Sequence, residues 1–190
     1  SELFEEVKYD LIIILGDRYE MLPVVNVALI YNIPVCHLHG GEKTLGNFDE
    51  SIRHAITKMS HLHLVASEEF KNRVIQLGEE EQNIHNIGAM GVENVIKQDF
   101  LTKKELEETL GLELEEEYYV VLFHPVTLED GGALKQIRTL LEVLSEQTKQ
   151  VVFIGSNSDT DSDKIMSAIE EYTKKHSSSK VFISLKPREY

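Results

Sequence analysis

Side chains capable of chemistry follow the first apolar run of the chain, LIIIL at residues 11–15. Gly16, Asp17 and Arg18 come directly after this run. Glycine lets the backbone turn sharply or a ligand approach it closely. A carboxylate acts as a base or binds sugar hydroxyls, and an arginine binds phosphate. The alternative is that Asp17 only caps the next helix and forms a local ion pair.

A second polar group, His39-Gly40-Gly41-Glu42, follows the apolar run at 35–38. Two glycines at the end of a strand make room for a ligand or expose backbone N–H groups to an anion. An ordinary glycine turn explains the same composition. We expect His39 to face a ligand, with Glu42 beside it.

Two His-x-His pairs, at residues 37 and 39 and at 61 and 63, suggest a metal site at first sight. Alternation along a strand puts each pair on one face of the sheet. Neither a cysteine ligand nor an HExxH motif accompanies them. We therefore favour histidines that are in the core or hydrogen-bonded, and expect no metal.

A third group, Asp49, Glu50 and Arg53, opens a helical segment. Acids in a first turn interact favourably with the helix dipole. Arg53 lies three and four residues after the two acids, on a shared helix face. The group is either a surface ion-pair cluster or a set of site carboxylates held by an arginine, and the sequence leaves both open.

Two polar segments follow apolar runs in the second half of the chain. His124 comes after the run at 118–123, and Pro125 prevents the strand from continuing its hydrogen-bond ladder. Asn157 and Asp159 lie in a small polar loop after the run at 151–154. Ligands of open α/β sheets bind at the carboxyl ends of the strands, so these residues are candidates for the same kind of site.

The apolar runs and helical segments alternate, which predicts an α/β fold with parallel sheets. Expected strands are 11–15, 35–38, 63–66, 118–123, 151–154 and 181–185. Expected helices are 20–31, 49–59, 68–77, 103–110, 133–147 and 161–175. Residues 97–117 hold eight acids and three bases and form an acidic helical linker in this interpretation. Two Rossmann-like parts, 1–96 and 118–190, then lie on either side of it.

Composition excludes several classes of protein. The 190 residues carry a formal charge of −14, which argues against nucleic-acid binding. No apolar stretch has the length of a membrane helix, so no membrane partner is expected. The single cysteine, Cys36, fits a reducing, cytoplasmic compartment.

A strand candidate begins at residue 11 and the last one ends five residues before the end of the sequence. We therefore expect a piece of a longer protein rather than a compact natural chain.

Three segments together resemble the UDP-N-acetylglucosamine 2-epimerases: ILGDRYEML at 14–22, HLHGGEKTLGNFDESIRHAITKMSHLH at 37–63 and FHPVT at 123–127. The GGE and SIRHAITK segments are similar to the hydrolysing branch, which forms N-acetylmannosamine for sialic or related nonulosonic acids. The resemblance covers most of the chain. It implies two Rossmann-like domains of the glycosyltransferase-B kind, each incomplete here.

The resemblance also implies an activity. UDP is eliminated across C1–C2 of UDP-N-acetylglucosamine to give 2-acetamidoglucal, and water then adds to give N-acetylmannosamine. The carboxylates of Asp17, Glu42, Asp49 and Glu50 suit two tasks, which are to remove the C2 proton and to stabilise positive charge at C1. Arg18, Arg53, His124 and backbone N–H groups suit the phosphates or the sugar.

The catalytic candidates are therefore Asp17, Glu42, Asp49, Glu50 and His124. The candidates for substrate binding are Arg18, His39, Gly40, Gly41, Arg53, Asn157 and Asp159. Many family members carry Glu where this chain has His39, so the group that fills that role is open. No cofactor is implied, and family members are usually dimers or tetramers. The rivals are a non-hydrolysing epimerase, a UDP-sugar glycosyltransferase of the same architecture and a nucleotide-sugar-binding module without turnover.

Overall fold

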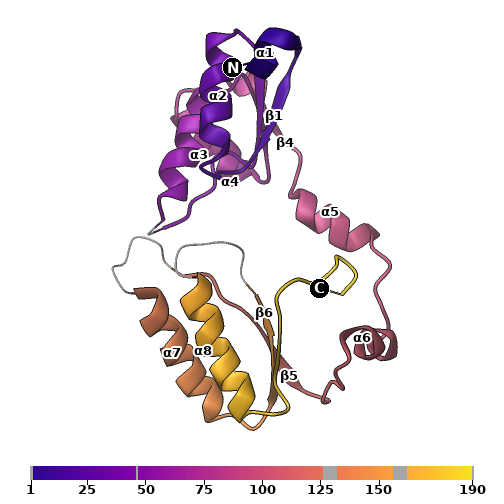
Figure 1. Cartoon of the computed structure of the whole chain (residues 1–190). Coiled ribbons are helices and arrows are strands. Elements are labelled where there is room, and N and C mark those ends of the chain that lie inside the picture. Colours follow the sequence, from indigo (N-terminus) through magenta and orange to yellow (C-terminus); the bar gives the residue numbers. More distant parts are fainter. Residues whose placement is uncertain (1, 46, 126–131, 156–161, 190) are drawn as a thin grey trace. The chain divides into compact units, whose positions relative to one another are not determined.

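The computed structural model describes residues 2–45, 47–125, 132–155 and 162–189. The chain divides into two compact units, Ser1–Lys97 and Gln98–Tyr190 (Figure 1). Each unit contains one parallel β-sheet. We describe each unit by itself.

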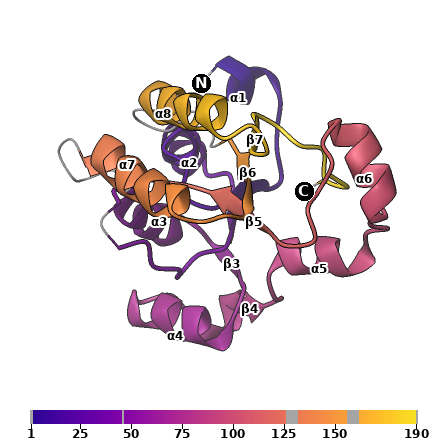
Figure 2. The same cartoon turned by 90° about the horizontal axis from the view of Figure 1, so that it is seen from below.

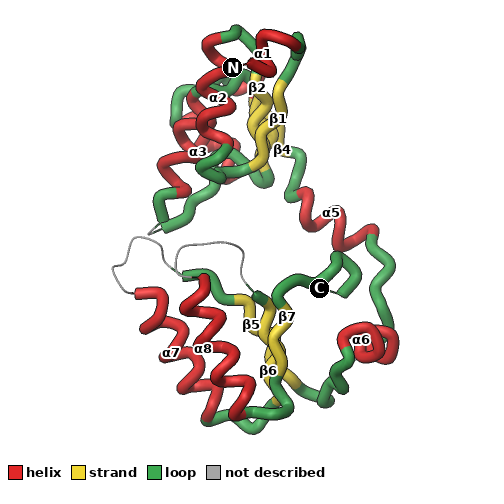
Figure 3. Tube along the Cα trace, in the orientation of Figure 1, coloured by secondary structure: helices red, strands yellow, loops and turns green. Residues whose placement is uncertain are grey.

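The first unit contains a four-stranded sheet in the order β1-β2-β3-β4. The strands are β1 (Ile12–Leu15), β2 (Val35–Leu38), β3 (Leu62–Val65) and β4 (Ile84–Asn86). The helices are α1 (Glu2–Glu6), α2 (Met21–Ile30), α3 (Asp49–Lys58), α4 (Glu68–Gln76) and α5 (Met90–Lys97), with a 3-10 turn at Glu81–Asn83. All neighbouring strands pair in parallel. Their carboxyl ends therefore lie along a common edge, where polar side chains from different strands can meet (Figure 3).

The order of these strands determines where the connecting helices lie. Right-handed crossovers between strands added successively in one direction put every crossover helix on the same face. Helices α2 and α3 accordingly pack on one face of β1 and β2, around Val25, Val35 and Ile56 (Figure 1). Helix α4 packs through Val74 against β3 and β4. Ile13 on the other face of β1 is 64% exposed in the described part of the chain.

The second unit contains a three-stranded parallel sheet in the order β5-β6-β7. Its strands are β5 (Tyr118–Leu122), β6 (Gln150–Ile154) and β7 (Lys180–Phe182), and its helices are α6 (Lys103–Leu110), α7 (Gly132–Ser145) and α8 (Ser162–Lys175). Helices α7 and α8 lie side by side on one face of the sheet (Figures 1 and 2). Ile137, Phe153 and Ile165 are fully or almost fully buried in the core between them.

The α/β fold expected from the sequence is confirmed, and each expected strand and helix occurs within a few residues of its place. Ser67 caps α4, since its hydroxyl accepts a hydrogen bond from the Phe70 N–H at 3.3 Å. Helices α1 and α5 were missed. The α5 sequence has a glycine, Gly91, in its first turn, and glycine has low helix propensity. Strand β4 is also absent from the strands expected from the sequence. Residues 98–117 belong to the second unit, with α6 as their helical part.

No helix in the described ranges combines the length and apolar character that crossing a membrane requires.

Candidate functional site

Arg53 is the centre of the polar cluster at the carboxyl edge of the first sheet. It lies in the second turn of α3, and only 4% of its surface is exposed. Its Nη2 donates to the carboxylate of Asp17, which follows β1, and at 2.8 Å to the hydroxyl of Thr44. Its Nη1 donates to the backbone oxygen of Glu42 at 2.9 Å. One guanidinium therefore ties the end of β1 to the loop between β2 and α3.

Burial lowers the pKa of the Arg53 guanidinium. An arginine nevertheless keeps its charge in proteins, because its ordinary value is far above neutral pH. The positive charge is thus fixed beside Asp17 and holds that carboxylate in one orientation. Arg53 does hold a carboxylate, but neither of the two sequence-based alternatives for this helix names the right one. The carboxylate concerned is Asp17, not the helix neighbours Asp49 or Glu50.

His39 and Glu42 form a second pair at this edge. The backbone N–H of His39 donates to Leu64 O at 2.9 Å, so the residue continues the ladder of the sheet past the end of β2. Its φ of 63° is in the left-handed region, which non-glycine residues rarely adopt. Its Nδ1 lies 2.8 Å from Oε1 of Glu42. Both side chains are partly exposed, at 23% and 33%.

Glu50 and Asp49 lie in the first turn of α3, where the helix dipole favours acids. Oε2 of Glu50 accepts from the backbone N–H of Thr44 at 3.1 Å. Its Oε1 lies 3.8 Å from Nε2 of His54, one turn further along the helix. Burial lowers the pKa of His54, and Glu50 opposes that shift. Glu50 therefore holds the same loop that Arg53 holds, while Asp49 is half-buried beside it.

His37 supports this cluster from within the sheet and is fully buried. Its Nε2 lies 2.8 Å from the carbonyl oxygen of Gly16, which can only accept, so Nε2 carries the proton. Its Nδ1 therefore accepts from the hydroxyl of Thr57 at 3.1 Å. Burial lowers the pKa of His37 to about 4, so the ring is neutral at pH 7. One histidine thus links the turn before Asp17 to the helix that carries Arg53.

The other histidines of the two His-x-His pairs also have protein partners. Nδ1 of His61 accepts from the backbone N–H of Val35 at 3.3 Å. The buried His63 lies with its Nε2 3.2 Å from Oε2 of Glu79. These contacts agree with the expectation of hydrogen-bonded or core histidines. The described residues hold no cluster of three or more His, Cys, Asp or Glu side chains suited to a metal ion.

Gly40 and Gly41 have a packing reason for lacking side chains. A Cβ on Gly40 would lie 3.1 Å from Nδ1 of His37 and 3.2 Å from the Thr57 hydroxyl. A Cβ on Gly41, whose φ is 81°, would lie 2.4 Å from the backbone oxygen of Phe70 in α4. The glycines therefore let the loop pack closely on its supports. Substrate binding by their backbones stays a prediction.

Arg18 pairs with a neighbour on its own segment. Its Nη2 donates to Oε1 of Glu20 at 2.6 Å and its Nε to Oε2 at 3.1 Å. Half of its side-chain surface is exposed. Its proposed phosphate contact stays a prediction.

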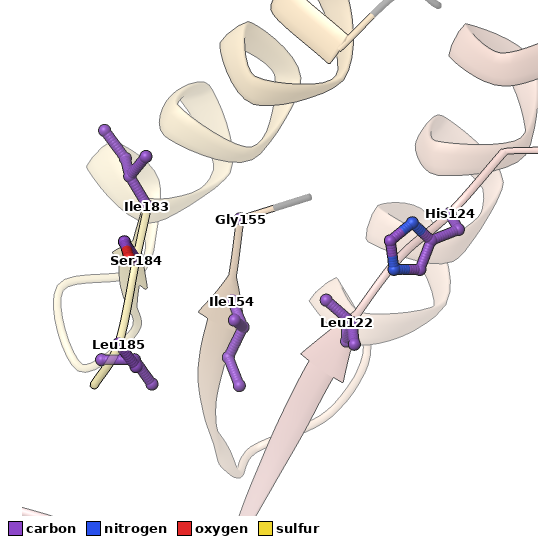
Figure 4. Close-up of a pocket in the computed structure, with 7 residues that line it drawn as sticks. All are labelled: Leu122, His124, Ile154, Gly155, Ile183, Ser184 and Leu185. Carbon is purple, nitrogen blue, oxygen red and sulfur yellow. The ribbon is translucent and has the colours of Figure 1, made fainter. Parts of the chain in front are cut away.

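In the second unit, His124 follows β5 as expected and is exposed. It lines an open pocket of about 240 Å³ at the carboxyl ends of β5 and β6 (Figure 4). The other lining residues are Leu122, Ile154, Gly155, Ile183, Ser184 and Leu185. The close approach of β7 explains Gly155, since a Cβ there would lie 3.0 Å from Cα of Ile183. Asn157 and Asp159 lie outside the described residues.

Sequence analysis did not single out Thr44 and Thr57, or recognise the bridging part of His37. Nothing in residue type distinguishes such threonines, because their partners are far away in the sequence. The spacing from His37 to Gly40 was a usable signal. Gly40 leaves room for the His37 ring and for the Thr57 hydroxyl that bonds to it, because a Cβ at that position would lie close to both.

Fold and site together define an α/β protein of the glycosyltransferase-B kind, with parallel Rossmann-like sheets and polar clusters at their carboxyl edges. The solved structure of a UDP-GlcNAc 2-epimerase from Neisseria meningitidis bound to UDP-GlcNAc matches 99% of this chain and 53% of its own, with a TM-score of 0.77 and 18% identity. The enzyme from Methanocaldococcus jannaschii in complex with UDP-GlcNAc and UDP matches 99% and 53%, with a TM-score of 0.76 and 16% identity.

The model of the UDP-N-acetylglucosamine 2-epimerase family matches residues 1–190, and the chain belongs to that family. It is 43% identical to the GDP/UDP-N,N'-diacetylbacillosamine 2-epimerase (hydrolyzing) of Campylobacter jejuni and 45% identical to the polysialic acid biosynthesis protein P7 of Escherichia coli. Both matches cover the whole chain but only 50% and 49% of the relatives. The chain therefore spans about half the length of the curated relatives that it matches.

Proposed function

We propose that the protein containing this chain is a hydrolysing UDP-N-acetylglucosamine 2-epimerase, which forms N-acetylmannosamine and UDP. One observation carries the proposal: the Asp17–Arg53 pair and the His39–Glu42 pair share one strand edge, in a chain that the family model matches over residues 1–190. The name of the Campylobacter jejuni relative includes the hydrolysing reaction, which supports this branch over the non-hydrolysing one.

The chemistry of the substrate explains why such a site is needed. No carbonyl activates the C2 proton of the sugar, so simple deprotonation and reprotonation is unfavourable. Elimination breaks the C2–H and C1–O bonds and forms a C1=C2 double bond, and UDP leaves with the electron pair of the C1–O bond. Water then adds across the double bond of 2-acetamidoglucal. The reaction requires a base near C2, negative charge near C1 and positive groups near the diphosphate.

Asp17 suits the charge at C1, because Arg53 fixes its carboxylate beside the strand edge. A carboxylate that already accepts from a guanidinium is a weaker base but remains a good electrostatic stabiliser. Arg53 is committed to three protein acceptors. We therefore assign it to holding Asp17 rather than to gripping phosphate. Arg18 and His124 remain the candidates for the diphosphate, and Asn157 and Asp159 remain candidates for substrate binding by sequence.

The test is an assay of the full-length protein with UDP-N-acetylglucosamine, with products identified by mass spectrometry. Free N-acetylmannosamine and UDP in equal amounts are expected. UDP-N-acetylmannosamine as the product would instead establish the non-hydrolysing reaction. Binding without any turnover would favour a nucleotide-sugar-binding module, and dependence on an acceptor would favour a glycosyltransferase.

A second substrate has specific support. The relatives from Campylobacter jejuni and, at 36% identity, Legionella pneumophila carry diacetylbacillosamine in their names. UDP-N,N'-diacetylbacillosamine differs from UDP-N-acetylglucosamine at C4 and C6, so the same chemistry at C1 and C2 applies. Comparing kcat/KM for both substrates decides between them.

The name of the Escherichia coli relative supports a place in the synthesis of sialic or related acids. The homo-oligomeric state and the cytoplasmic location stay predictions.

A further inference from the structure

The conformation of His39 is unusual for its residue type. Its φ of 63° places it in the left-handed region, where a side chain on Cβ is strained against the backbone. Glycine would adopt this conformation without that strain, and the next two residues are glycines. The conformation directs the chain from β2 into the loop that holds Glu42. The site thus carries an imidazole at a position where the backbone alone would favour glycine.

Glu42 determines which nitrogen of His39 carries the proton. A carboxylate accepts hydrogen bonds, so the contact of 2.8 Å to Oε1 requires a proton on Nδ1. In the neutral ring Nε2 then has a lone pair and can accept a proton. Among the described residues, none forms a hydrogen bond with Nε2 of His39. A carboxylate behind an imidazole fixes its tautomer and stabilises the imidazolium that forms when Nε2 takes up a proton.

The neighbouring carboxylates are less suited to act as the base. Asp17 accepts from the buried guanidinium of Arg53, and Glu50 accepts from the N–H of Thr44. Each of these carboxylates therefore already accepts a hydrogen bond from the protein. His39 differs, because its contact with Glu42 engages Nδ1 and leaves the lone pair on Nε2.

We propose that His39 is the catalytic base that removes the C2 proton in the elimination, with Glu42 as its positioning residue. This inference rests on the proposed function. In the step, Nε2 takes the C2 proton, the electrons of the C2–H bond form the C1=C2 bond, and UDP leaves with the electrons of the C1–O bond. Glu42 balances the charge of the resulting imidazolium.

The sharpest variant is His39→Asn in the full-length protein. Asparagine tolerates the left-handed region, and its amide N–H₂ lies near the place of Nδ1, so it keeps a donor for Glu42 but has no base. We expect kcat for UDP release to fall about 100-fold or more while KM changes less than about threefold. His85→Asn, at an exposed histidine of β4, is the matched control and keeps wild-type kinetics. A His39→Asn enzyme with kcat within about threefold of wild type overturns the proposal.

A second arm separates loss of the base from loss of the fold. Supplied with 2-acetamidoglucal and UDP, His39→Asn should hydrate the glycal at a rate within about threefold of wild type, because that half-reaction does not use the elimination base. If His39→Asn loses glycal hydration as well as elimination, the assignment of His39 to C2 deprotonation is overturned. A wild-type enzyme that releases no UDP contradicts the proposed function itself, which distinguishes the two failures.

The dependence of His39 on Glu42 is tested by non-additivity. Glu42→Gln leaves an acceptor oxygen but removes the charge, and kcat should fall about 10-fold or more. The double variant His39→Asn/Glu42→Gln should be no slower than His39→Asn alone, since residues that act as a unit are not additive. Independent, multiplicative losses would show that Glu42 does not act through His39.

Discussion

Arg53 in α3 donates a hydrogen bond to the carboxylate of Asp17, which follows β1 and lies 36 residues earlier in the sequence. The side-chain exposures are 5% for Arg53 and 27% for Asp17, so the pair is largely removed from water. Charge-assisted hydrogen bonds in such surroundings are stronger than those at an exposed surface. This pair joins two segments that the sheet topology brings to one edge.

Replacing Arg53 by lysine should destabilise the first unit. Lysine keeps the charge but cannot serve Asp17, Thr44 and the Glu42 carbonyl at once, because it lacks the planar fork of donors. We expect the free energy of unfolding in urea to fall by about 2–3 kcal/mol. Arg18→Lys is the control: that pair is exposed and should change stability by less than about 0.5 kcal/mol. Equal effects of the two substitutions would contradict a structural part for Arg53.

Asp17→Asn tests the carboxylate separately from its support. Asparagine retains the shape of the side chain and an oxygen that accepts from Arg53, so the fold should be kept. Turnover should fall about 100-fold or more, because a neutral amide does not stabilise positive charge at C1. Steady-state UDP release and the thermal midpoint are measured on the same samples. Full turnover in Asp17→Asn would contradict the part assigned to this residue.

The sequence was sufficient to predict which side chains lie at the carboxyl edge of the first sheet. It was not sufficient to predict which of those side chains pair with one another. Parallel strands put Asp17 and His39 at a common edge, and that follows from the alternation of strands and helices. Helical spacing suggested that Arg53 would pair with Asp49 or Glu50, its neighbours on α3. Arg53 instead reaches Asp17, because the packing of α3 on the sheet, which local spacing does not encode, brings that carboxylate closer.

The pH dependence of stability should carry the signature of His37. Its pKa in the folded state is about 4, below the ordinary value of 6.5, because burial disfavours the charged ring. The unfolded chain therefore binds more protons below pH 6.5. The contribution of His37 to the free energy of unfolding is fully present above pH 6.5. It is lost as the pH falls from 6.5 to about 4, by up to about 1.4 kcal/mol per pH unit.

The measurement is urea unfolding of wild type and His37→Gln at pH 7.5 and pH 5. Glutamine retains a donor for the Gly16 carbonyl but does not titrate. The loss of stability between the two pH values should be smaller in the variant by about 1–2 kcal/mol. His63, whose pKa burial also lowers, remains in both proteins and accounts for part of the residual slope. Identical losses in the two proteins would rule out His37 as a source of the pH dependence.

Gly41 and Gly16 offer a matched test of close packing. Both have positive φ, 81° and 73°, so alanine is strained at either position. Only at Gly41 would the new Cβ collide with the backbone of α4, since nothing lies within 4 Å of a Cβ on Gly16. Gly16→Ala should cost about 1 kcal/mol and Gly41→Ala about 3 kcal/mol in urea unfolding. Equal costs would mean that the loop moves away from Phe70 freely.

His124→Gln tests the pocket of the second unit. The side chain is exposed and lines the pocket at the carboxyl ends of β5 and β6, so the substitution should leave stability within about 0.5 kcal/mol of wild type. If His124 contacts the nucleotide sugar, kcat/KM for UDP release should fall about 10-fold or more, because glutamine lacks a titrating nitrogen. His85→Gln, the same change at another exposed histidine, is the control and should be silent. Since both side chains are exposed, a selective loss at His124 reports on the site and not on the fold. Wild-type kcat/KM in both variants would remove His124 from the site.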